Sequence, residues 1–311
     1  KPIQKNYQRN WRNKRQASRA EKVIDTANKN SSNPKIKLEL FNAAQRIAYN
    51  LLYEHPLYET GNDNVNVLII GAGTIGLEIA KAAAWCSQMT SRSFSIKIFD
   101  KDKKNERADF PFNSLSEKLS KIGTTLDLKF FECDIFSEKF SSLRPERADY
   151  IAINLGDDSL NLSAALLLQE TYARQRTDGG LIPADAPAVK IIVIIKDEET
   201  KKIVKALDNS AIIPYAAMSD VFKLDNIINW KIDKAGEFLH ASYESVNYIN
   251  KHPETESDLL ELLNQGISSY AAQSELNKRS SRAAAIHSKY KLSDIGIDVK
   301  NSHLFSEATE K

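Results

Sequence analysis

Apolar segments and amphipathic segments alternate through the middle of the chain. Six short segments carry apolar runs or alternate apolar with polar residues, both of which are typical of strands. These predicted strands are 65–70, 94–100, 126–135, 149–155, 189–196 and 211–215. Apolar residues spaced three or four positions apart predict helices between them, at 75–87, 115–122, 159–172 and 199–207. Strands that alternate with helices predict an α/β fold with a doubly wound, parallel, Rossmann-like sheet.

The two flanks of this region have different patterns. Residues 1–34 are polar and basic, and we interpret them as a leader and linker. Residues 35–58 place apolar side chains on one helical face up to Pro56, whereas after residue 219 the strand patterns give way to helical ones. Three parts are therefore expected: a basic leader (1–34), a Rossmann nucleotide-binding domain with an N-terminal helix (35–219) and a smaller helical C-terminal domain (220–311).

Charge is unevenly distributed along the chain. The net charge of +2 over 311 residues does not favour nucleic acid as a partner. Residues 1–22, however, contain eight Lys or Arg and one acid. Such a block suits an anionic membrane surface or nucleic acid, with Trp11 as an interfacial anchor, and it equally suits a solvated, partly helical leader.

Cysteine content and hydropathy bear on the cellular compartment. Cys86 and Cys133 are the two cysteines, and both lie in apolar segments, which predicts buried free thiols and a cytoplasmic location. The sequence contains no apolar run of about 18 residues and no secretory signal, so no bilayer-spanning segment is expected. Because the chain begins with Lys, a membrane segment upstream and a membrane-associated effector stay open.

A glycine cluster follows the first apolar run, in the sequence VLIIGAGTIG at 67–76. It fits the pattern G-x-G-x-x-G between a strand and a helix, the context in which the pattern predicts nucleotide binding. The first glycine allows a tight turn, the second lets the backbone approach a pyrophosphate, and the third lets helix and strand pack closely. The candidate phosphate-binding residues are Gly71, Ala72, Gly73, Thr74, Ile75 and Gly76. The alternative is a Rossmann-like domain whose pocket has degenerated.

Acidic residues end the next two predicted strands. Asp100 is expected to accept hydrogen bonds from ribose hydroxyls and to repel a 2′-phosphate, which favours NAD over NADP. Lys101 follows it and would soften that discrimination, and the alternative for Asp100 is an exposed acid at a strand end. Asp134 and Ile135 end the third strand, where adenine is expected.

Polar residues also follow the fourth predicted strand, at the carboxyl edge where ligands bind in such sheets. They are Asn154, Gly156, Asp157 and Asp158. The two adjacent acids are candidates for a metal site or an acid–base pair. Asp158 and Ser159 are also good helix N-caps, and capping is the role we expect.

These residues carry a resemblance to a known family. The segments NVLIIGAGTIGLEIAKAA, Asp100, CDI (133–135) and INLGDDSLNLSAALLLQE (153–170) resemble the NAD-binding domains of Trk-type potassium-uptake regulators, also called regulator-of-potassium-conductance domains. In that family an Asn follows the Gly-Asp-Asp turn in the next helix, and Asn161 matches it. The resemblance covers about residues 64–216.

The resemblance implies a cytoplasmic regulatory domain that binds NAD(H) or another adenine nucleotide, commonly dimerises and transfers no hydride. Two features depart from the family pattern. The connection at 87–94 is long, and the family's small C-terminal ligand domain of strands and helices is missing.

The helical region after the sheet is similar in places to the ryanodine-receptor-type domain that follows such Rossmann domains in some prokaryotic proteins. His240 and Tyr243 match an Ile/Leu-His-x-x-Tyr segment, and 280–285 loosely matches a Ser-Asn-Arg-x-x-Ala segment, without its Asn and without an expected tryptophan. The basic residues here form a candidate anion site near a helix start, made of Lys278, Arg279, Ser280 and Arg282. The alternative is a capped amphipathic helix with a basic outer face.

Three functions stay open at this point. We favour a non-catalytic nucleotide-binding module that regulates an ion channel, a transporter or another effector. An NAD-dependent oxidoreductase would need a proton donor, and the sequence offers only Asn154, Asp158 and Lys196 at strand ends, with no Tyr-x-x-x-Lys helix. The third function is a sensor of a nucleotide second messenger in a defence or stress system.

Overall fold

The computed structural model describes residue 26 and residues 41–60, 62–102, 126–177, 189–206, 211–216, 218–253 and 258–297. Contacts divide the described residues into two compact units. Among the described residues, the Rossmann unit comprises Ala43–Ile232 and 285–297, and the helical unit comprises Asp233–Ala284 together with residues 26, 41 and 42. Apart from residue 26, the predicted basic leader lies outside the described residues, as does the predicted helix at 115–122.

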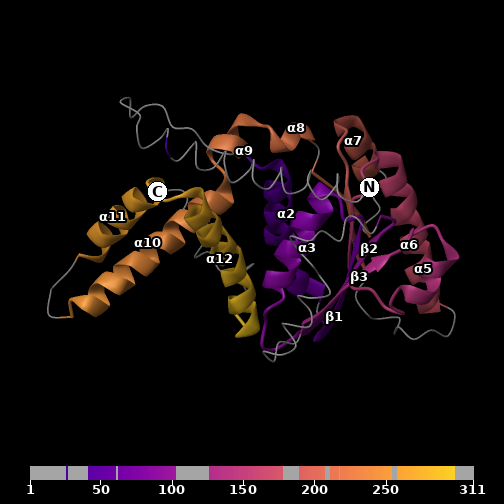
Figure 1. Ribbon diagram of the computed structural model, residues 1–311, viewed down its shortest axis with the longest axis horizontal. Coiled ribbons are helices and arrows are strands. Elements are labelled where there is room, and N and C mark those ends of the chain that lie inside the picture. Colours follow the sequence, from indigo (N-terminus) through magenta and orange to yellow (C-terminus); the bar gives the residue numbers. More distant parts are fainter. Residues whose placement is uncertain are drawn as a thin grey trace, which may run out of the picture. The chain divides into compact units, whose positions relative to one another are not determined.

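A six-stranded parallel sheet forms the centre of the Rossmann unit (Figure 1). Its strands are β1 (Asn64–Ile70), β2 (Ser93–Asp100), β3 (Leu126–Glu132), β4 (Tyr150–Ile153), β5 (Lys190–Ile194) and β6 (Ile212–Tyr215). Their spatial order is β3-β2-β1-β4-β5-β6, with every neighbouring pair parallel. The predicted Rossmann-like fold is therefore confirmed, and the order reverses between β1 and β4, where such sheets bind ligands.

Helices cover both faces of this sheet (Figure 1). One face carries α2 (Ala43–Glu54) and α3 (Thr74–Cys86), and the other carries α5 (Glu138–Leu143), α6 (Asp158–Thr177) and α7 (Glu198–Ala206). Three short helices complete the unit: η1 (Leu57–Thr60), α8 (Met218–Val221) and α9 (Leu224–Ile228). The sequence pattern did not predict α5, which has six residues and a single buried side chain, that of Phe140.

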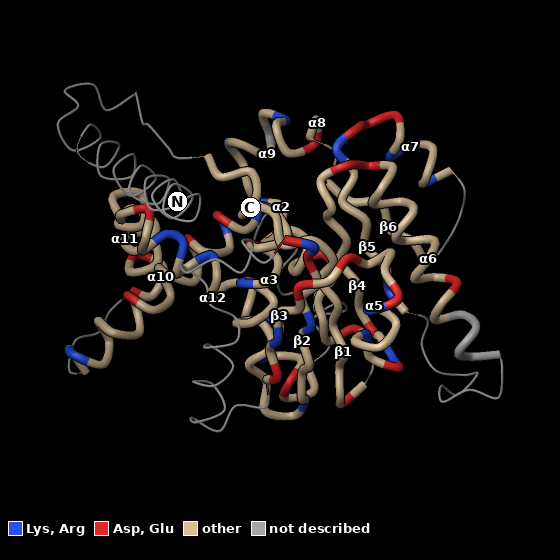
Figure 2. The backbone as a smooth tube through the Cα atoms, turned by 45° about the vertical axis from the view of Figure 1, so that its right-hand side comes forward, with Lys and Arg blue, Asp and Glu red and all other residues tan. Residues whose placement is uncertain are grey.

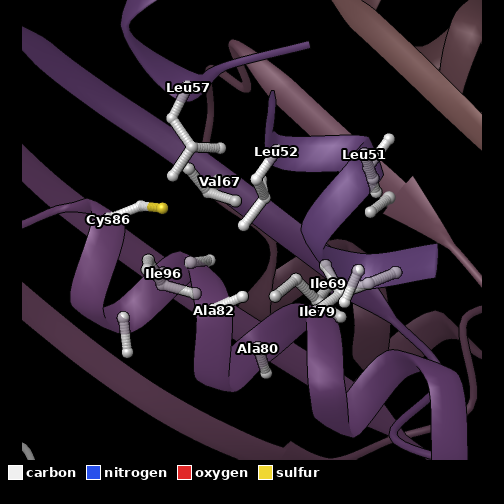
Figure 3. Packing of buried hydrophobic residues seen from close by; sticks show 14 of the residues in the cluster. Leu51, Leu52, Leu57, Val67, Ile69, Ile79, Ala80, Ala82, Cys86 and Ile96 are labelled. Atoms are coloured by element: carbon white, nitrogen blue, oxygen red, sulfur yellow. The ribbon is translucent and has the colours of Figure 1, made fainter. Parts of the chain in front are cut away.

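The side chains of β1 show why its sequence is apolar almost throughout. Val67 and Ile69 belong to the buried cluster beneath α2 and α3, whereas Leu68 and Ile70 belong to the cluster beneath α6. Since successive strand residues point to opposite faces, a strand covered on both sides must be apolar at nearly every position. Figure 3 shows the first of these clusters, with Leu52 of α2 turned toward Val67.

Contacts place residues 220–232 and the end of the last helix with the sheet. Trp230 lies in the cluster beneath α2, where its ring stacks on Tyr49 with centroids 6.2 Å apart. Ile286 and Tyr290 belong to the same cluster and are fully buried. The Tyr290 hydroxyl accepts from the Leu57 amide and donates to the Leu52 carbonyl. These contacts attach the chain after residue 285 to the sheet.

Three helices make up the helical unit: α10 (Lys231–Lys251), α11 (Leu259–Ala271) and α12 (Glu275–Asp294), of which α12 continues into the Rossmann unit. Gly266 of α11 lies against Ala241 of α10, and a Cβ added to this glycine would lie 2.6 Å from the Ala241 Cα. Close backbone approach therefore holds the two helices together. No helix among the described residues is both long enough and apolar enough to cross a membrane.

Both cysteines are free and buried, as predicted. Burial raises the pKa of the Cys86 thiol well above its ordinary value, against the opposing effect of a hydrogen bond with Tyr290. Lys and Arg are interspersed with Asp and Glu along the described backbone (Figure 2).

The end of α12 is held by the connection between α3 and β2, the one that the sequence shows to be long. One oxygen of the Asp294 carboxylate accepts from the amide and hydroxyl of Thr90, and the other accepts from those of Ser91. Burial opposes ionisation of this acid, but the four donors outweigh that effect and hold the pKa of Asp294 below its usual range.

We expect Asp294→Asn to lower the stability of the Rossmann unit at pH 7 by about 1 kcal/mol, the contribution of a charge-assisted bond that solvent partly screens. A lowered pKa stabilises the fold above the pKa of the unfolded chain, about 3.9, and this contribution disappears as the pH falls toward the folded value. The stability difference between the two proteins should therefore shrink below about pH 4. Urea denaturation at several pH values measures it, with Asp127→Asn, an exposed acid paired with Lys129, as the control. A difference that stays constant with pH would contradict the assignment.

Candidate functional site

A pocket of about 490 Å³ opens at the carboxyl ends of β1 to β5. Its volume falls within the range of pockets that hold small organic ligands. Ten residues of the sequence-based nucleotide site line it: Gly71, Gly73, Thr74, Ile75, Asp100, Lys101, Asp134, Ile135, Asn154 and Gly156. Residues from four separate loops therefore converge because parallel strands bring their carboxyl ends to one edge.

Close backbone packing requires glycine at two of the three glycine positions of the motif. Gly71 has a φ of +89°, and a Cβ added to it would lie 2.1 Å from the Asn154 carbonyl oxygen. A Cβ added to Gly76 would lie 1.8 Å from the carbonyl oxygen of Gly71. The turn after β1 is thus pressed between the end of β4 and the first turn of α3, where no side chain fits.

Gly73 has a different environment, because space lies beside it. An added Cβ would meet only the Asn154 side-chain nitrogen, at 3.9 Å. Gly73 is the N-cap residue of α3, and no side chain caps this helix. The first N–H groups of a helix lack acceptors within the helix and carry a partial positive charge. Since Gly73, Thr74 and Ile75 line the pocket, this end of α3 offers an anion both open space and hydrogen-bond donors.

Asn154 carries a buried polar atom without a protein partner. Its side chain is 7% exposed, it lines the pocket, and its Oδ1 makes no hydrogen bond. An unsatisfied buried polar group costs about 1–3 kcal/mol, so native structures rarely keep one without a reason. A ligand that donates a hydrogen bond to this atom beside the glycine turn would supply that reason.

Asp100 ties the end of β2 to the glycine turn. It is 8% exposed, and its Oδ2 accepts from the Ala72 amide at 2.6 Å while Oδ1 accepts from the Asp102 amide at 2.8 Å. A carboxylate offers about four acceptor positions, so room remains for ribose hydroxyls. The Ala72 amide, in contrast, already has its partner, and Ala72 does not line the pocket. The expected contact of Ala72 with phosphate is thus corrected to a structural bond.

Asn161 is a candidate nucleotide-binding residue because it matches the family's Asn, but it is fully buried and holds two strand ends together. Its Oδ1 accepts from the Leu155 amide at 2.6 Å, and its Nδ2 donates to the Ile194 carbonyl at 2.7 Å. Neither atom is turned to the pocket, which Asn161 does not line. It therefore positions the loop after β4 instead of contacting a ligand.

The two adjacent acids after β4 also have structural partners. Asp157 caps α6, because its Oδ1 accepts from the Leu160 amide at 3.0 Å. The carboxylate of Asp158 accepts from the backbone amides of Lys196 and Asp197, so it joins the start of α6 to the end of β5. Capping was expected from Asp158 or Ser159, and the residue that caps is Asp157. No cluster of three or more metal-binding side chains occurs in the described part of the chain.

Several lining residues were not in the sequence-based site. The pocket also includes Ile70, Phe99, Asp102, Cys133, Phe136, Leu155, Leu160 and Lys196. Asp134 makes a turn that holds Phe136, since its Oδ1 accepts from the Phe136 amide at 2.9 Å. Lys196 was expected at a strand end only as a candidate proton donor, and the rule that ligands bind at carboxyl strand ends also includes it in the nucleotide site.

The candidate anion site in the helical unit has internal partners for its main cations. Arg282 is buried, and its guanidinium binds Asp233 at 2.7 Å and Glu275 at 2.6 Å. Burial would raise the pKa of Asp233, but the Arg282 guanidinium and the Tyr270 hydroxyl hold it below its usual range. Lys278 donates to the Ala271 carbonyl at 3.1 Å. These contacts link α10, α11 and α12, and the geometry of Lys278 and Arg282 does not support an anion site.

Comparison with known proteins adds no family to this geometry: no family model matches the chain, and no curated protein matches it.

Proposed function

We propose that the Rossmann unit binds an adenine nucleotide, with NAD(H) as the first candidate, and that this ligand regulates the protein instead of serving as a hydride carrier. One observation carries the proposal: the unpaired, buried amide oxygen of Asn154 lies beside an uncapped helix N-terminus with open space at Gly73. The combination supports a ligand that brings both an anionic group and a hydrogen-bond donor.

The lining residues suit the parts of such a nucleotide in order along the sheet. The N–H groups of Gly73, Thr74 and Ile75 are the proposed phosphate donors. The Asp100 carboxylate accepts from the ribose hydroxyls, and the wall formed by Asp134 to Phe136 lies along the side where adenine is bound. Asp100 and Asp102 disfavour a 2′-phosphate by charge repulsion, and Lys101 between them reduces this effect without cancelling it, which supports NAD(H) over NADP(H).

The same lining supports a regulatory role over catalysis. Hydride transfer needs a proton donor or acceptor at the reacting carbon, most often a His, Tyr or Lys. Among the described lining residues there is no His and no Tyr, and the Asp158 carboxylate is engaged by backbone amides. Lys196, the lining lysine on the β4–β5 side, donates its Nζ to the Gly156 carbonyl at 2.6 Å. The resemblance to regulator-of-potassium-conductance domains agrees with this proposal. We further propose a homo-oligomer, an ion channel or transporter as the effector, and a cytoplasmic location beside a membrane-associated effector.

Regulation requires that the ligand bind two states of the protein with different affinity. The loop after β4 is the element through which occupancy would act, because Asn154 and Gly156 line the pocket while Asn161 and Asp158 join the same loop to β5. A ligand bond to the Asn154 amide would therefore favour one arrangement of β4, α6 and β5.

A thermal-shift series tests the proposal directly. The full chain is heated alone and with NAD⁺, NADH, NADP⁺, ATP, ADP, AMP and cyclic nucleotides. We expect NAD⁺ or NADH to raise the melting temperature most, since a ligand at a hundredfold excess over its Kd stabilises by about 2.7 kcal/mol. Of the two oxidised dinucleotides, NADP⁺ should raise the melting temperature less than NAD⁺ does. A parallel assay follows NADH absorbance for turnover, and we expect none.

Each other outcome changes the conclusion in a defined way. A shift with ATP, ADP or a cyclic nucleotide and none with NAD(H) would overturn the choice of ligand in favour of a second-messenger sensor. Steady NADH consumption with a carbonyl substrate would overturn the non-catalytic role. No shift with any nucleotide would contradict the nucleotide site itself.

A further inference from the structure

Lys196 has a fixed position on the β4–β5 side of the pocket. It directly follows β5, and its backbone is held on both sides: its amide donates to the Asp158 carboxylate, and its carbonyl accepts from the Met218 amide at 3.1 Å. Its side chain lines the pocket, and Nζ donates to the Gly156 carbonyl at 2.6 Å. The ammonium group therefore lies beside the loop after β4.

The acids near Lys196 are turned to other partners. Asp158 accepts from the amides of Lys196 and Asp197, and it does not line the pocket. Asp197 caps α7 by accepting from the amide and hydroxyl of Thr200. On the β4–β5 side, the other described lining residues are Asn154, Leu155, Gly156 and Leu160, all of them uncharged. Among the described lining residues on this side, Lys196 is thus the one that carries a charge.

The two halves of the pocket differ in charge, and the sheet sets the distance between them. On the β2–β3 side the acids Asp100, Asp102 and Asp134 outnumber the one lysine, Lys101, whereas Lys196 lies beyond β4 at β5. Four strand spacings of about 4.8 Å separate β3 from β5, or about 19 Å. A mononucleotide bound between the glycine turn and Asp134 leaves the β4–β5 side unfilled, and a dinucleotide reaches it with its second base.

We infer that Lys196 selects against a cationic group on the ligand's second half, so that the protein binds NADH in preference to NAD⁺. This inference rests on the proposed function. The nicotinamide ring is positively charged in NAD⁺ and neutral in NADH, and the two ligands are otherwise nearly alike. Repulsion between the ring and the Lys196 ammonium lowers the affinity for NAD⁺ alone.

The test compares three ligands and three proteins by isothermal titration calorimetry: NADH, NAD⁺ and AMP with the wild type, Lys196→Met and Lys196→Arg. We expect the wild type to bind NADH about fivefold more tightly than NAD⁺, the size of a repulsion between unit charges in a solvent-exposed site. Lys196→Met should bring the ratio of the two Kd values close to one, and Lys196→Arg should retain it. AMP affinity should not change, and higher salt should reduce the wild-type ratio.

The ratio separates charge selection from a structural effect. Loss of the bond to the Gly156 carbonyl would weaken NADH and NAD⁺ equally and leave their ratio unchanged. A ratio that Lys196→Met does not alter therefore overturns the inference while the nucleotide site stands. If neither dinucleotide binds the wild type, the proposed function fails first, so the two failures are distinguishable.

Discussion

Replacement of Gly76 by alanine is expected to lower the free energy of unfolding of the Rossmann unit by about 3 kcal/mol, the upper range for overpacking of a close-packed site. The added methyl group would lie 1.8 Å from the Gly71 carbonyl oxygen, which is itself part of a turn pressed against β4. Alanine is otherwise favourable inside a helix by about 1 kcal/mol relative to glycine. The loss must therefore come from the clash, because helix propensity acts in the opposite direction.

Urea denaturation followed by circular dichroism measures this loss, and Gly73→Ala is the matched control. Gly73 lies three residues earlier at the same helix end, and an added Cβ meets only a side-chain nitrogen at 3.9 Å. The control should cost about 1 kcal/mol or less, the usual penalty for alanine at an N-cap. If both variants unfold at the same urea concentration, the close contact between α3 and the turn is wrong.

Replacement of Gly73 by aspartate is expected to weaken nucleotide binding about a hundredfold and to leave the fold as stable as the wild type. Aspartate is a favourable N-cap residue, so its side chain accepts the N–H bonds that the uncapped α3 leaves open. The same carboxylate then takes the place of the ligand's phosphate and repels it, a loss of roughly 3 kcal/mol in a partly enclosed site. Calorimetry with the ligand selected by the thermal-shift series measures the affinity.

The isosteric variant Gly73→Asn separates charge from size. It caps the helix through a neutral side chain, so it should lose affinity by less than Gly73→Asp. Melting temperatures without ligand should stay close to the wild-type value for both variants. Wild-type affinity in Gly73→Asp would falsify the glycine turn as the phosphate site.

The strands could be predicted because the sheet is covered on both faces. Burial on both sides demands apolar residues at successive positions, and such runs are visible without the structure, as in residues 191–194 of β5, all fully buried. The predicted strand at 126–135 is three residues too long, because β3 ends at Glu132. Cys133 and Ile135 are apolar because they line the pocket and pack beneath the sheet, not because they continue the ladder.

The candidate site was predicted less completely, because sequence shows which polar residues reach the sheet edge but not which partners they find there. Asp157, Asp158 and Asn161 all follow β4, and backbone groups within the protein take up the hydrogen bonds of all three. Asn154 lies in the same segment and keeps an unpaired oxygen in the pocket. Lys196 lies far along the chain and joins them only because β4 and β5 are neighbours.

The sequence by itself determined the alternation of strands and helices, the glycine turn after the first strand, and the burial of both cysteines. Each follows from the spacing or the hydropathy of residues that are close together in the sequence. Only the tertiary structure decided which glycine has space for a ligand, which acid caps α6, and that Arg282 is neutralised by Asp233 and Glu275. These outcomes depend on contacts between residues remote in the chain, which are Gly71 with Asn154, Asp158 with Lys196, and Arg282 with Asp233. Folding alone brings such residues together.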